Sequence, residues 1–353
     1  MASRAGKATA GGSPDKPLLA VLRGERRDPP PFWMMRQAGR YLPEYRELRA
    51  AKGGFLALVY DSEAAAEITL QPLKRFALDA AILFSDILIV PYALGQNLTF
   101  VAGEGPRLTP PLAGADLADL SPFPKRLEPI YATVRQVKEQ LDPAATLIGF
   151  AGSPWTVATY MVAGEGSREQ ADARQLAYRD SGRFGAIIDR IEAMTFDYLS
   201  GQIDAGADVV QLFDSWSGSL APAEFERWVI GPTARLVARL KERHPRIPVI
   251  GFPKGAGGKL GAYARETRVN ALGLDETVDP AWAHKELPRG LAVQGNLDPL
   301  ALLAGGDALR ANVRRILDAL AERPHIFNLG HGIIKETPIA HVEALIAMLK
   351  GKA

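Results

Sequence analysis

Cysteine is absent from the 353-residue sequence. This absence excludes disulfides, thiolate-bound zinc, iron–sulfur clusters and cysteine nucleophiles, and it fits a protein of the reducing cytoplasm. Long apolar runs are absent too, because no stretch approaches the roughly 18 uninterrupted residues that a membrane-spanning helix needs. The first 16 residues also lack the apolar block of a secretory signal. We therefore expect a soluble, cytoplasmic protein that does not insert into a membrane.

A large net charge is missing as well, since 42 Lys and Arg residues oppose 40 Asp and Glu residues, for a formal charge of +2. A chain without a basic excess has little general attraction for nucleic acid, so we expect no nucleic-acid partner. Any affinity for an anionic small molecule must then come from the local placement of Arg and Lys. Hydrophobic residues make up 47% of the chain, which is typical of a globular protein with one large core.

Residues 1–16 are rich in Ala, Gly and Ser, a composition typical of a flexible N-terminal tail. An organellar transit peptide is the alternative interpretation of this stretch. Beyond it, no linker-like change of composition and no internal repeat interrupts the chain. We therefore expect a single domain over residues 17–353.

Short apolar runs recur along that domain, with amphipathic segments between them that are long enough for crossover helices. The eight runs cover residues 32–35, 80–84, 146–150, 208–213, 249–252, 271–274, 291–294 and 325–329. Several are almost wholly apolar, as expected of parallel strands covered on both faces. Residues 186–199 show the single apolar stripe of a helix. The pattern predicts an α/β fold, a single-domain (β/α)8 TIM-type barrel of parallel strands, with a doubly wound open sheet as the alternative.

Polar side chains follow these runs where each one stops. They are Arg36, Arg40, Asp86, Ser153, Asp214, Ser215, Lys254, Asp275, Asn296 and His331. Barrel enzymes place their chemistry at the C-terminal ends of the strands, so these positions predict an active-site cleft there. Loops are polar in any protein, however, and Asp, Ser and Asn often cap helices. Ser153 followed by Pro154 reads as a helix N-cap and first helical residue, so we expect Ser153 to be structural.

Residues 31–46, PFWMMRQAGRYLPEYR, hold the densest group of candidate binding residues. Arg36 and Arg40 stand four positions apart, so both guanidinium groups could face one way, and each matches a carboxylate bidentately. Gly39 leaves room for a ligand to approach the backbone. A surface salt-bridge role is the alternative for such a pair. The five histidines, at 244, 284, 325, 331 and 341, show no close pair with metal-binding spacing, so we expect no metal.

This run resembles the signature of the uroporphyrinogen decarboxylase family, and residues 149–162, GFAGSPWTVATYMV, resemble the family's second signature. Five shorter stretches are similar to further family motifs. They cover residues 83–88, 211–216, 251–255, 294–299 and 328–332. Seven motifs in one order are specific, although each alone would be weak. The resemblance extends from about residue 18 to residue 349.

The resemblance implies a (β/α)8 barrel that removes four acetate carboxyl groups from uroporphyrinogen III, giving coproporphyrinogen III and four CO2 in haem biosynthesis. It implies no cofactor, and a homodimer whose active sites face each other. Loss of CO2 from a saturated acetate arm needs a place for the released electron pair. A protonated pyrrole accepts that pair, and the resulting exocyclic methylene then takes up a proton to become a methyl group. The single domain over residues 17–353 is then the catalytic one.

The resemblance also assigns roles to individual residues. Asp86 accepts the pyrrole N–H groups and stabilises the ring cation, and Arg36 grips the reacting carboxylate, with proton delivery as an open alternative role for it. The expected substrate-binding residues are Arg36, Gln37, Ala38, Gly39, Arg40, Asp86, Tyr160, Ser215 and His331. Asp86 and Ser215 could instead cap helices, and Tyr160 could be a core aromatic. The glycines that flank His331 suit a backbone pressed against a ligand.

Two other functions compete with this interpretation. A corrinoid-linked methyltransferase of the same superfamily would share the barrel, but its zinc ligands include cysteine, which this chain lacks. A non-catalytic tetrapyrrole-binding protein would keep the barrel without turnover. The presence of Arg36, Arg40 and Asp86 argues against that second alternative.

Overall fold

A computed structural model describes residues 16–101 and 105–351. In this part of the chain, seven parallel strands form one curled sheet whose spatial order follows the sequence. The strands are β1 (Ala80–Ile82), β4 (Thr146–Gly152), β5 (Val209–Asp214), β6 (Val249–Pro253), β7 (Ala271–Gly273), β8 (Ala292–Leu297) and β9 (His325–Leu329). Every residue of β4, β8 and β9 is buried, which explains why these runs are mostly apolar.

The predicted first strand, over residues 32–35, is not a regular strand, and this prediction is wrong in that respect. Phe32 alone forms a parallel bridge, to Phe327 of β9. The N–H of Phe327 donates to Pro31 O over 2.9 Å, and on the other side the N–H of Asp79 donates to Phe32 O over 3.0 Å. The segment therefore lies between β9 and the residue that precedes β1.

The pairing stops after Phe32 because side chains take over the next backbone groups. The N–H of Met34 donates to Gln37 Oε1 over 3.1 Å, and the N–H of Met35 donates to Asn328 Oδ1 over 2.9 Å. The chain then turns at Arg36, whose φ of 61° lies in the left-handed region. A strand cannot continue through such a residue.

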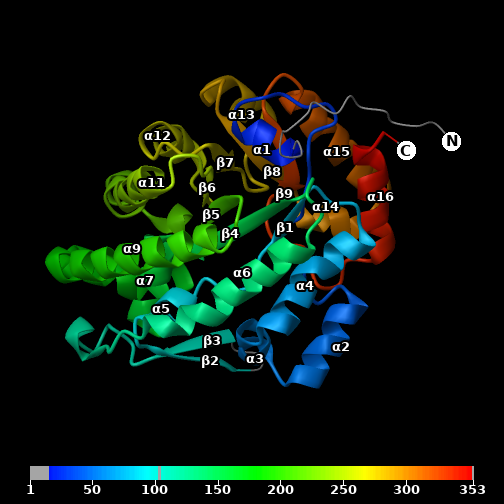
Figure 1. Cartoon of the computed structure of the whole chain (residues 1–353). Coiled ribbons are helices and arrows are strands. Elements are labelled where there is room, and N and C mark those ends of the chain that lie inside the picture. Colours follow the sequence, from blue (N-terminus) through cyan, green and yellow to red (C-terminus); the bar gives the residue numbers. More distant parts are fainter. Residues whose placement is uncertain (1–15, 102–104, 352–353) are drawn as a thin grey trace.

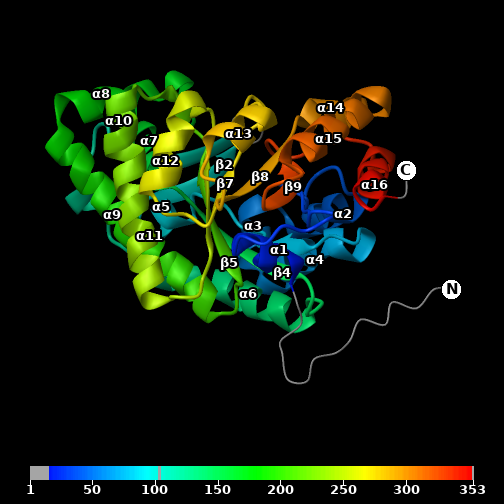
Figure 2. The same ribbon diagram turned by 90° about the horizontal axis from the view of Figure 1, so that it is seen from above.

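Helices cover the outside of the sheet (Figures 1 and 2). They are α1 (Pro17–Leu22), α2 (Pro43–Lys52), α3 (Phe55–Tyr60), α4 (Ser62–Arg75), α5 (Ile89–Ala93), α6 (Glu128–Gln140), α7 (Pro154–Ala163), α8 (Ala171–Arg179), α9 (Ser181–Asp204), α10 (Pro222–Phe225), α11 (Gly231–Arg243), α12 (Leu260–Glu266), α13 (Pro280–Glu286), α14 (Pro299–Ala304), α15 (Gly306–Leu320) and α16 (Ile339–Leu349). The predicted helix at 186–199 is confirmed within α9, and its apolar stripe is buried. Figure 2 shows the strands between α9 and α11 on one side and α14 to α16 on the other.

An antiparallel pair, β2 (Asn97–Val101) and β3 (Gly105–Thr109), stands apart from the main sheet. The pair was not predicted, because its short strands mix polar and apolar residues without an apolar run. It packs near α3 and α5, at the lower edge of the molecule in Figure 1. Helix α5 follows the loop after β1, so the pair lies near that loop.

The chain enters the fold at Lys16, the last residue of the expected tail. Its Nζ lies 2.6 Å from Asp208 Oδ2, and Lys138 Nζ lies 2.6 Å from Asp208 Oδ1. Lys16 is thus attached just ahead of β5, whereas the rest of the expected tail, residues 1–15, lies outside the described residues. In the described part of the chain, no helix combines the length and apolarity needed to cross a membrane.

Ser153 stands at the N-cap position of α7 with Pro154 as the first helical residue, as predicted. The expected capping bond is not formed. Among the described residues the buried Ser153 Oγ has no hydrogen-bond partner, and the N–H of Ser153 donates to Phe213 O over 2.8 Å. The backbone at Ser153 thus continues the pairing with β5 and turns the hydroxyl into the interior.

Gln202 of α9 ties this helix to β4. Its Oε1 accepts the N–H of Phe150 over 2.9 Å, and its Nε2 donates to Phe150 O over 3.0 Å, in a fully buried position. Gln202→Ala leaves two buried backbone groups unpaired beside a cavity, so we expect it to lower the free energy of unfolding by about 2–5 kcal/mol. Urea unfolding followed by circular dichroism measures this loss. The exposed Gln140→Ala in α6 is the control, and equal stabilities of the two variants would contradict the role of Gln202.

Candidate active site

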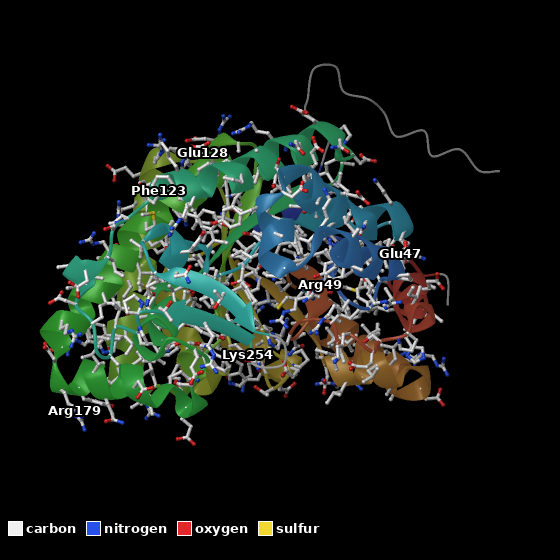
Figure 3. The ribbon with its side chains drawn as sticks, turned by 90° about the horizontal axis from the view of Figure 1, so that it is seen from below. Glu47, Arg49, Phe123, Glu128, Arg179 and Lys254 are labelled. Atoms are coloured by element: carbon white, nitrogen blue, oxygen red, sulfur yellow. The ribbon has the colours of Figure 1, made fainter. Side chains whose placement is uncertain are left out.

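The carboxyl ends of the strands meet at one edge of the sheet because the strands are parallel and closely in register. Cα partners such as Gly152 and Phe213, or Asp214 and Pro253, show this alignment. The side chains that follow the strands are therefore collected at this edge. In Figure 3, which views the molecule from below, Lys254 at the end of β6 lies near the middle and Arg179 at the periphery.

Asp86 lies in the loop after β1 and keeps a partly exposed surface. Its Oδ1 accepts the N–H of Leu88 over 2.8 Å. Helix α5 begins at Ile89 with Leu88 as its N-cap, so Asp86 is not the N-cap residue of that helix. Withdrawal from water raises the pKa of Asp86 to about 6, while the Leu88 N–H and the charge of Arg36 oppose the rise. The carboxyl group is therefore mostly ionised at neutral pH, beside a guanidinium.

The side chain of Arg36 packs against the loop that follows β9. A Cβ placed on Gly332 would lie 2.3 Å from Arg36 Cδ, so the arginine stem rests directly on this glycine. The N–H of Ile333 donates to Met35 O over 2.9 Å and ties the same two loops together. The left-handed φ of Arg36 is uncommon for a residue with a side chain and costs about 1–3 kcal/mol. Such strain persists only where the surroundings determine the position, and here the Gly332 loop does so.

His331 lies between Arg36 and the loop after β7. The preceding residue, Gly330, packs closely against the backbone of Glu276 in the loop after β7. A Cβ on Gly330 would lie 2.3 Å from the backbone N of Glu276. Burial is the main cause that lowers the pKa of His331 to about 4; the charges of Arg36 and Lys254 act in the same direction, and Asp275 opposes them. The imidazole is therefore neutral at neutral pH. Its Nδ1 is buried without a hydrogen-bond partner in the described part of the structure.

Tyr160 projects from α7 toward the same group. Its ring centroid lies 6.4 Å from that of Trp216. Burial raises the pKa of the Tyr160 phenol, Asp86 adds to the rise, and Trp216 and Arg36 oppose it. The hydroxyl therefore stays protonated and is close enough to Asp86 and Arg36 to sense both charges. It is partly exposed rather than sealed in the core.

Asp214, at the end of β5, holds the loop that carries Ser215 and Trp216. The fully buried Asp214 Oδ1 accepts a hydrogen bond from Thr156 Oγ1 over 2.5 Å, and Thr156 Oγ1 accepts the N–H of Trp216 over 3.1 Å. Burial raises the pKa of Asp214 to about 7. Ser215 is partly exposed, and the helical turn that follows has Trp216 as its N-cap, so Ser215 caps no helix in the described residues. Position after a strand drew attention to Asp214, but the sequence carried no sign of its bond to Thr156.

The other members of the arginine-rich run differ in their surroundings. Gln37 is buried and holds the loop, because its Oε1 accepts the Met34 N–H and its Nε2 donates to Ala80 O over 2.9 Å. Ala38 and Gly39 are partly exposed and Arg40 is exposed. Residues 36–42 form turns instead of a helix, so the four-residue spacing does not place Arg36 and Arg40 on one helical face. The binding roles of these residues remain predictions.

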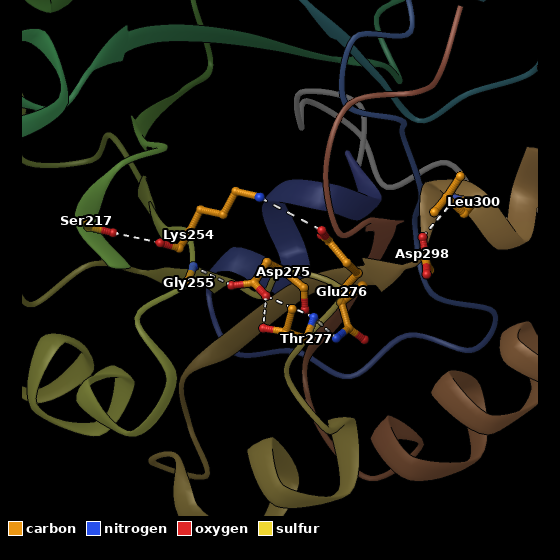
Figure 4. A network of polar contacts seen from close by, with 9 residues as sticks. Ser217, Lys254, Gly255, Asp275, Glu276, Thr277, Asp298 and Leu300 are labelled. Atoms are coloured by element: carbon orange, nitrogen blue, oxygen red, sulfur yellow. Dashed lines mark hydrogen bonds and ion pairs between the residues drawn. The ribbon is translucent and has the colours of Figure 1, made fainter. Parts of the chain in front are cut away.

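Lys254, Asp275 and Glu276 form a further group, at the ends of β6 and β7 (Figure 4). Asp275 Oδ2 accepts the N–H of Gly255 over 2.7 Å, and its Oδ1 accepts the N–H of Thr277 over 2.9 Å. Lys254 Nζ lies 3.9 Å from Glu276 Oε1. Lys254 and Asp275 stood among the residues that follow apolar runs, yet neither entered the predicted substrate site. Glu276 gave no signal, because one glutamate in a polar loop is ordinary.

No group of three or more His, Asp or Glu residues is placed to hold a metal ion within residues 16–101 and 105–351. The sequence model of the family described as uroporphyrinogen decarboxylase (URO-D) matches residues 13–351. The chain belongs to this family. The prediction drawn from the seven motifs is thereby confirmed.

Curated relatives agree with this assignment. A protein of Rhizorhabdus wittichii named uroporphyrinogen decarboxylase is 71% identical over 336 residues, covering 95% of this chain and 98% of the relative. Another of the same name, from Novosphingobium aromaticivorans, is 66% identical over 95% of this chain and 98% of its own length. At such identity over almost the whole length, the relatives and this chain share one architecture.

Solved structures with low identity show the fold alone. A methyltransferase from Methanosarcina mazei superposes with a TM-score of 0.79 at 18% identity, covering 95% of this chain and 97% of its own. A B12-independent methionine synthase from Shewanella sp. W3-18-1 gives a TM-score of 0.57 at 9% identity, over 92% of this chain and 96% of the other. Both likenesses concern the arrangement of helices and strands alone.

The contact between Gly332 and Arg36 can be tested by adding a methyl group. Gly332→Ala forces the Arg36 stem to move, because the new Cβ would meet Arg36 Cδ and Cγ within 3 Å. We expect turnover to fall at least tenfold, with the melting temperature nearly unchanged, since a flexible side chain can give way. Gly330→Ala is the contrasting variant. Its Cβ would meet the backbone of Glu276, so it should lower the melting temperature clearly. If Gly332→Ala kept full activity, the contact with Gly332 would not determine the position of the Arg36 side chain.

Proposed function

We propose that this protein removes the four acetate carboxyl groups of uroporphyrinogen III, producing coproporphyrinogen III and CO2. One observation carries the proposal: Arg36, whose stem contacts Gly332 beside His331, lies close enough to Asp86, Tyr160 and His331 to lower the pKa of each. These four residues come from four separate segments of the chain, and all are expected to contact the tetrapyrrole. Relatives up to 71% identical that are named uroporphyrinogen decarboxylase support the same reaction.

The arrangement suits a substrate with two different chemical faces. Four pyrrole N–H groups converge on one side of a porphyrinogen, and an ionised Asp86 accepts their hydrogen bonds. Carboxylates surround the ring, and the exposed guanidinium of Arg36 grips one of them in bidentate fashion. Tyr160 supplies a hydroxyl, and the neutral imidazole of His331 supplies one N–H donor. Binding by both faces holds an acetate arm beside the ring position that must be protonated.

The chemistry then follows from the pyrrole itself. Protonation of a ring carbon makes the pyrrole cationic, and the nearby Asp86 carboxylate lowers the energy of that cation. The bond from the acetate methylene to its carboxylate breaks, CO2 leaves, and the electron pair neutralises the ring as an exocyclic double bond. Protonation of the methylene carbon and loss of the first proton from the ring complete the methyl group. No oxidant or reductant is required, because one proton replaces each CO2.

Three finer features belong to the same proposal. The junction at Phe32, with hydrogen bonds to β9 and to Asp79, supports closure of the sheet into an eight-membered barrel. The family resemblance supports a homodimer whose active sites face each other. The absence of cysteine supports a cytoplasmic location.

The reaction is tested with purified protein and reduced uroporphyrinogen III, with and without a chelator. We expect chromatography to resolve products with seven to four carboxyl groups, in equal yield with chelator. Arg36→Lys keeps a positive charge but loses the fork, so we expect kcat/KM to fall at least tenfold. Arg243→Lys, at an exposed ion pair with Asp204, is the control and should retain full activity. Tight binding without any CO2 release would favour the non-catalytic alternative.

The pKa of Asp86, raised to about 6, predicts the pH dependence of activity. Since the carboxylate is the working form, kcat/KM should fall about tenfold per pH unit below that value. An activity profile that stays flat down to pH 5 would contradict this assignment.

The same shift has a consequence for stability. The folded pKa of Asp86 lies above the unfolded value of about 3.9, so its contribution is most favourable below pH 4 and is lost as the pH rises through 6. We therefore expect Asp86→Asn to be inactive at pH 8 yet more heat-stable than the unchanged protein, and to match it near pH 4. Comparing the two proteins isolates Asp86 from Asp214, which also titrates at a raised pKa of about 7.

A further inference from the structure

The backbone of Lys254, at the carboxyl end of β6, is held by hydrogen bonds to neighbouring loops. Its carbonyl oxygen accepts Ser217 Oγ over 3.0 Å and the N–H of Gly218 over 3.1 Å, and its N–H donates to Asp214 O over 3.1 Å. The N–H of the next residue, Gly255, is held by Asp275. The backbone on both sides of the side chain is therefore fixed by the neighbouring loops, as Figure 4 shows. These hydrogen bonds fix the Cα of Lys254, from which the long, flexible side chain carries the ammonium group.

The head of that side chain is only loosely paired. The 3.9 Å between Lys254 Nζ and Glu276 Oε1 is an ion-pair distance, well beyond the roughly 3.2 Å limit of a good hydrogen bond. Glu276 Oε2 is buried and, among the described residues, has no hydrogen-bond partner. A carboxylate and an ammonium that are both partly withdrawn from water normally saturate each other. This pair leaves hydrogen-bonding capacity open on both members.

The pair also adjoins the proposed substrate site. Gly330 is packed against the backbone of Glu276, and Gly332 is packed against Arg36, so His331 stands between the two groups. Both Arg36 and Lys254 lower the pKa of His331, which places both cations near its ring. Lys254 is thus a second cation near His331, paired with Glu276, whose backbone contacts Gly330.

We propose that Lys254 binds a carboxylate on the rim of the substrate and that Glu276 is the counter-ion which this carboxylate displaces. The inference rests on the proposed function, since it needs a ligand that carries many carboxylates. Without ligand, Glu276 neutralises the ammonium. A substrate carboxylate that can approach within hydrogen-bond distance replaces the loose 3.9 Å pair.

The exchange makes affinity depend on the number of carboxylates left on the ring. As acetate groups become methyl groups, fewer rim carboxylates compete with Glu276 for Lys254, and a less charged product is held less tightly. A lysine suits this role better than an arginine, because its point charge swings on a flexible stem and needs no fixed bidentate partner. Glu276 therefore favours release of the product.

Three variants test this exchange in steady-state kinetics, with uroporphyrinogen III as substrate and coproporphyrinogen III as added inhibitor. Lys254→Met removes the cation, and the loss of one charge-assisted hydrogen bond should raise KM about 10- to 100-fold with a smaller effect on kcat. Lys254→Arg keeps the charge and should restore KM to within a few-fold of the unchanged protein. Glu276→Gln removes the competitor, so it should lower KM and make the product a stronger inhibitor.

Lys285→Met and Glu286→Gln provide a matched control. These residues form an exposed ion pair of 3.7 Å at the end of α13, just ahead of β8 and thus at the opposite edge of the sheet. They should leave KM and product inhibition unchanged.

An unchanged KM in Lys254→Met, or weaker product inhibition in Glu276→Gln, would overturn the inference while leaving the decarboxylation itself established. If Lys254→Met does not fold, Glu276→Gln decides alone, because its predicted direction is opposite to that of simple destabilisation. Absence of CO2 release from the unchanged protein would instead refute the proposed function.

Discussion

The site depends on the junction that residues 31–35 make between the first and last strands of the sheet. Phe32 pairs with Phe327 on one side, and its carbonyl receives the N–H of Asp79 on the other. Asp79 directly precedes β1, which leads to Asp86, and Phe327 belongs to β9, which leads to His331. Arg36 follows four residues after Phe32, so it necessarily emerges between these two partners. Without the junction, Arg36 would have no reason to lie near either of them.

Side chains reinforce this junction more than regular pairing does. Gln37 holds the turn to Ala80 O, and Asn328 holds the N–H of Met35. Gly332 then leaves space for the Arg36 stem. The left-handed backbone conformation of Arg36 is strained, and it accompanies an exposed position of the side chain. The contacts with these neighbours offset the strain. Precision at the site thus comes from buried polar residues that fix the backbone of this loop.

Charge is distributed unevenly across the site. Arg36 is exposed and Lys254 is half-buried, so both cations keep contact with water. The pKa of Asp86 and that of Asp214 are raised by withdrawal from water, to about 6 and about 7. This contrast between accessible cations and carboxyl groups withdrawn from water suits a polyanionic ligand. The cations attract the carboxylates on its rim, and a carboxylate in a less polar setting interacts strongly with the ring.

The buried strands and the polar residues that follow them could be predicted from the sequence. Buried parallel strands had to be apolar runs, and polar residues after them had to meet at one edge, so β1 and β4 to β9, together with Asp86 and His331, were accessible to prediction. The seven motifs established the family. Tertiary structure alone decided that residues 32–35 form a single bridge, that Arg36 and Arg40 do not share a helical face, and that Glu276 pairs with Lys254. Each of these depends on contacts between residues distant in the chain, such as Gly332 with Arg36, whose energies no local pattern encodes.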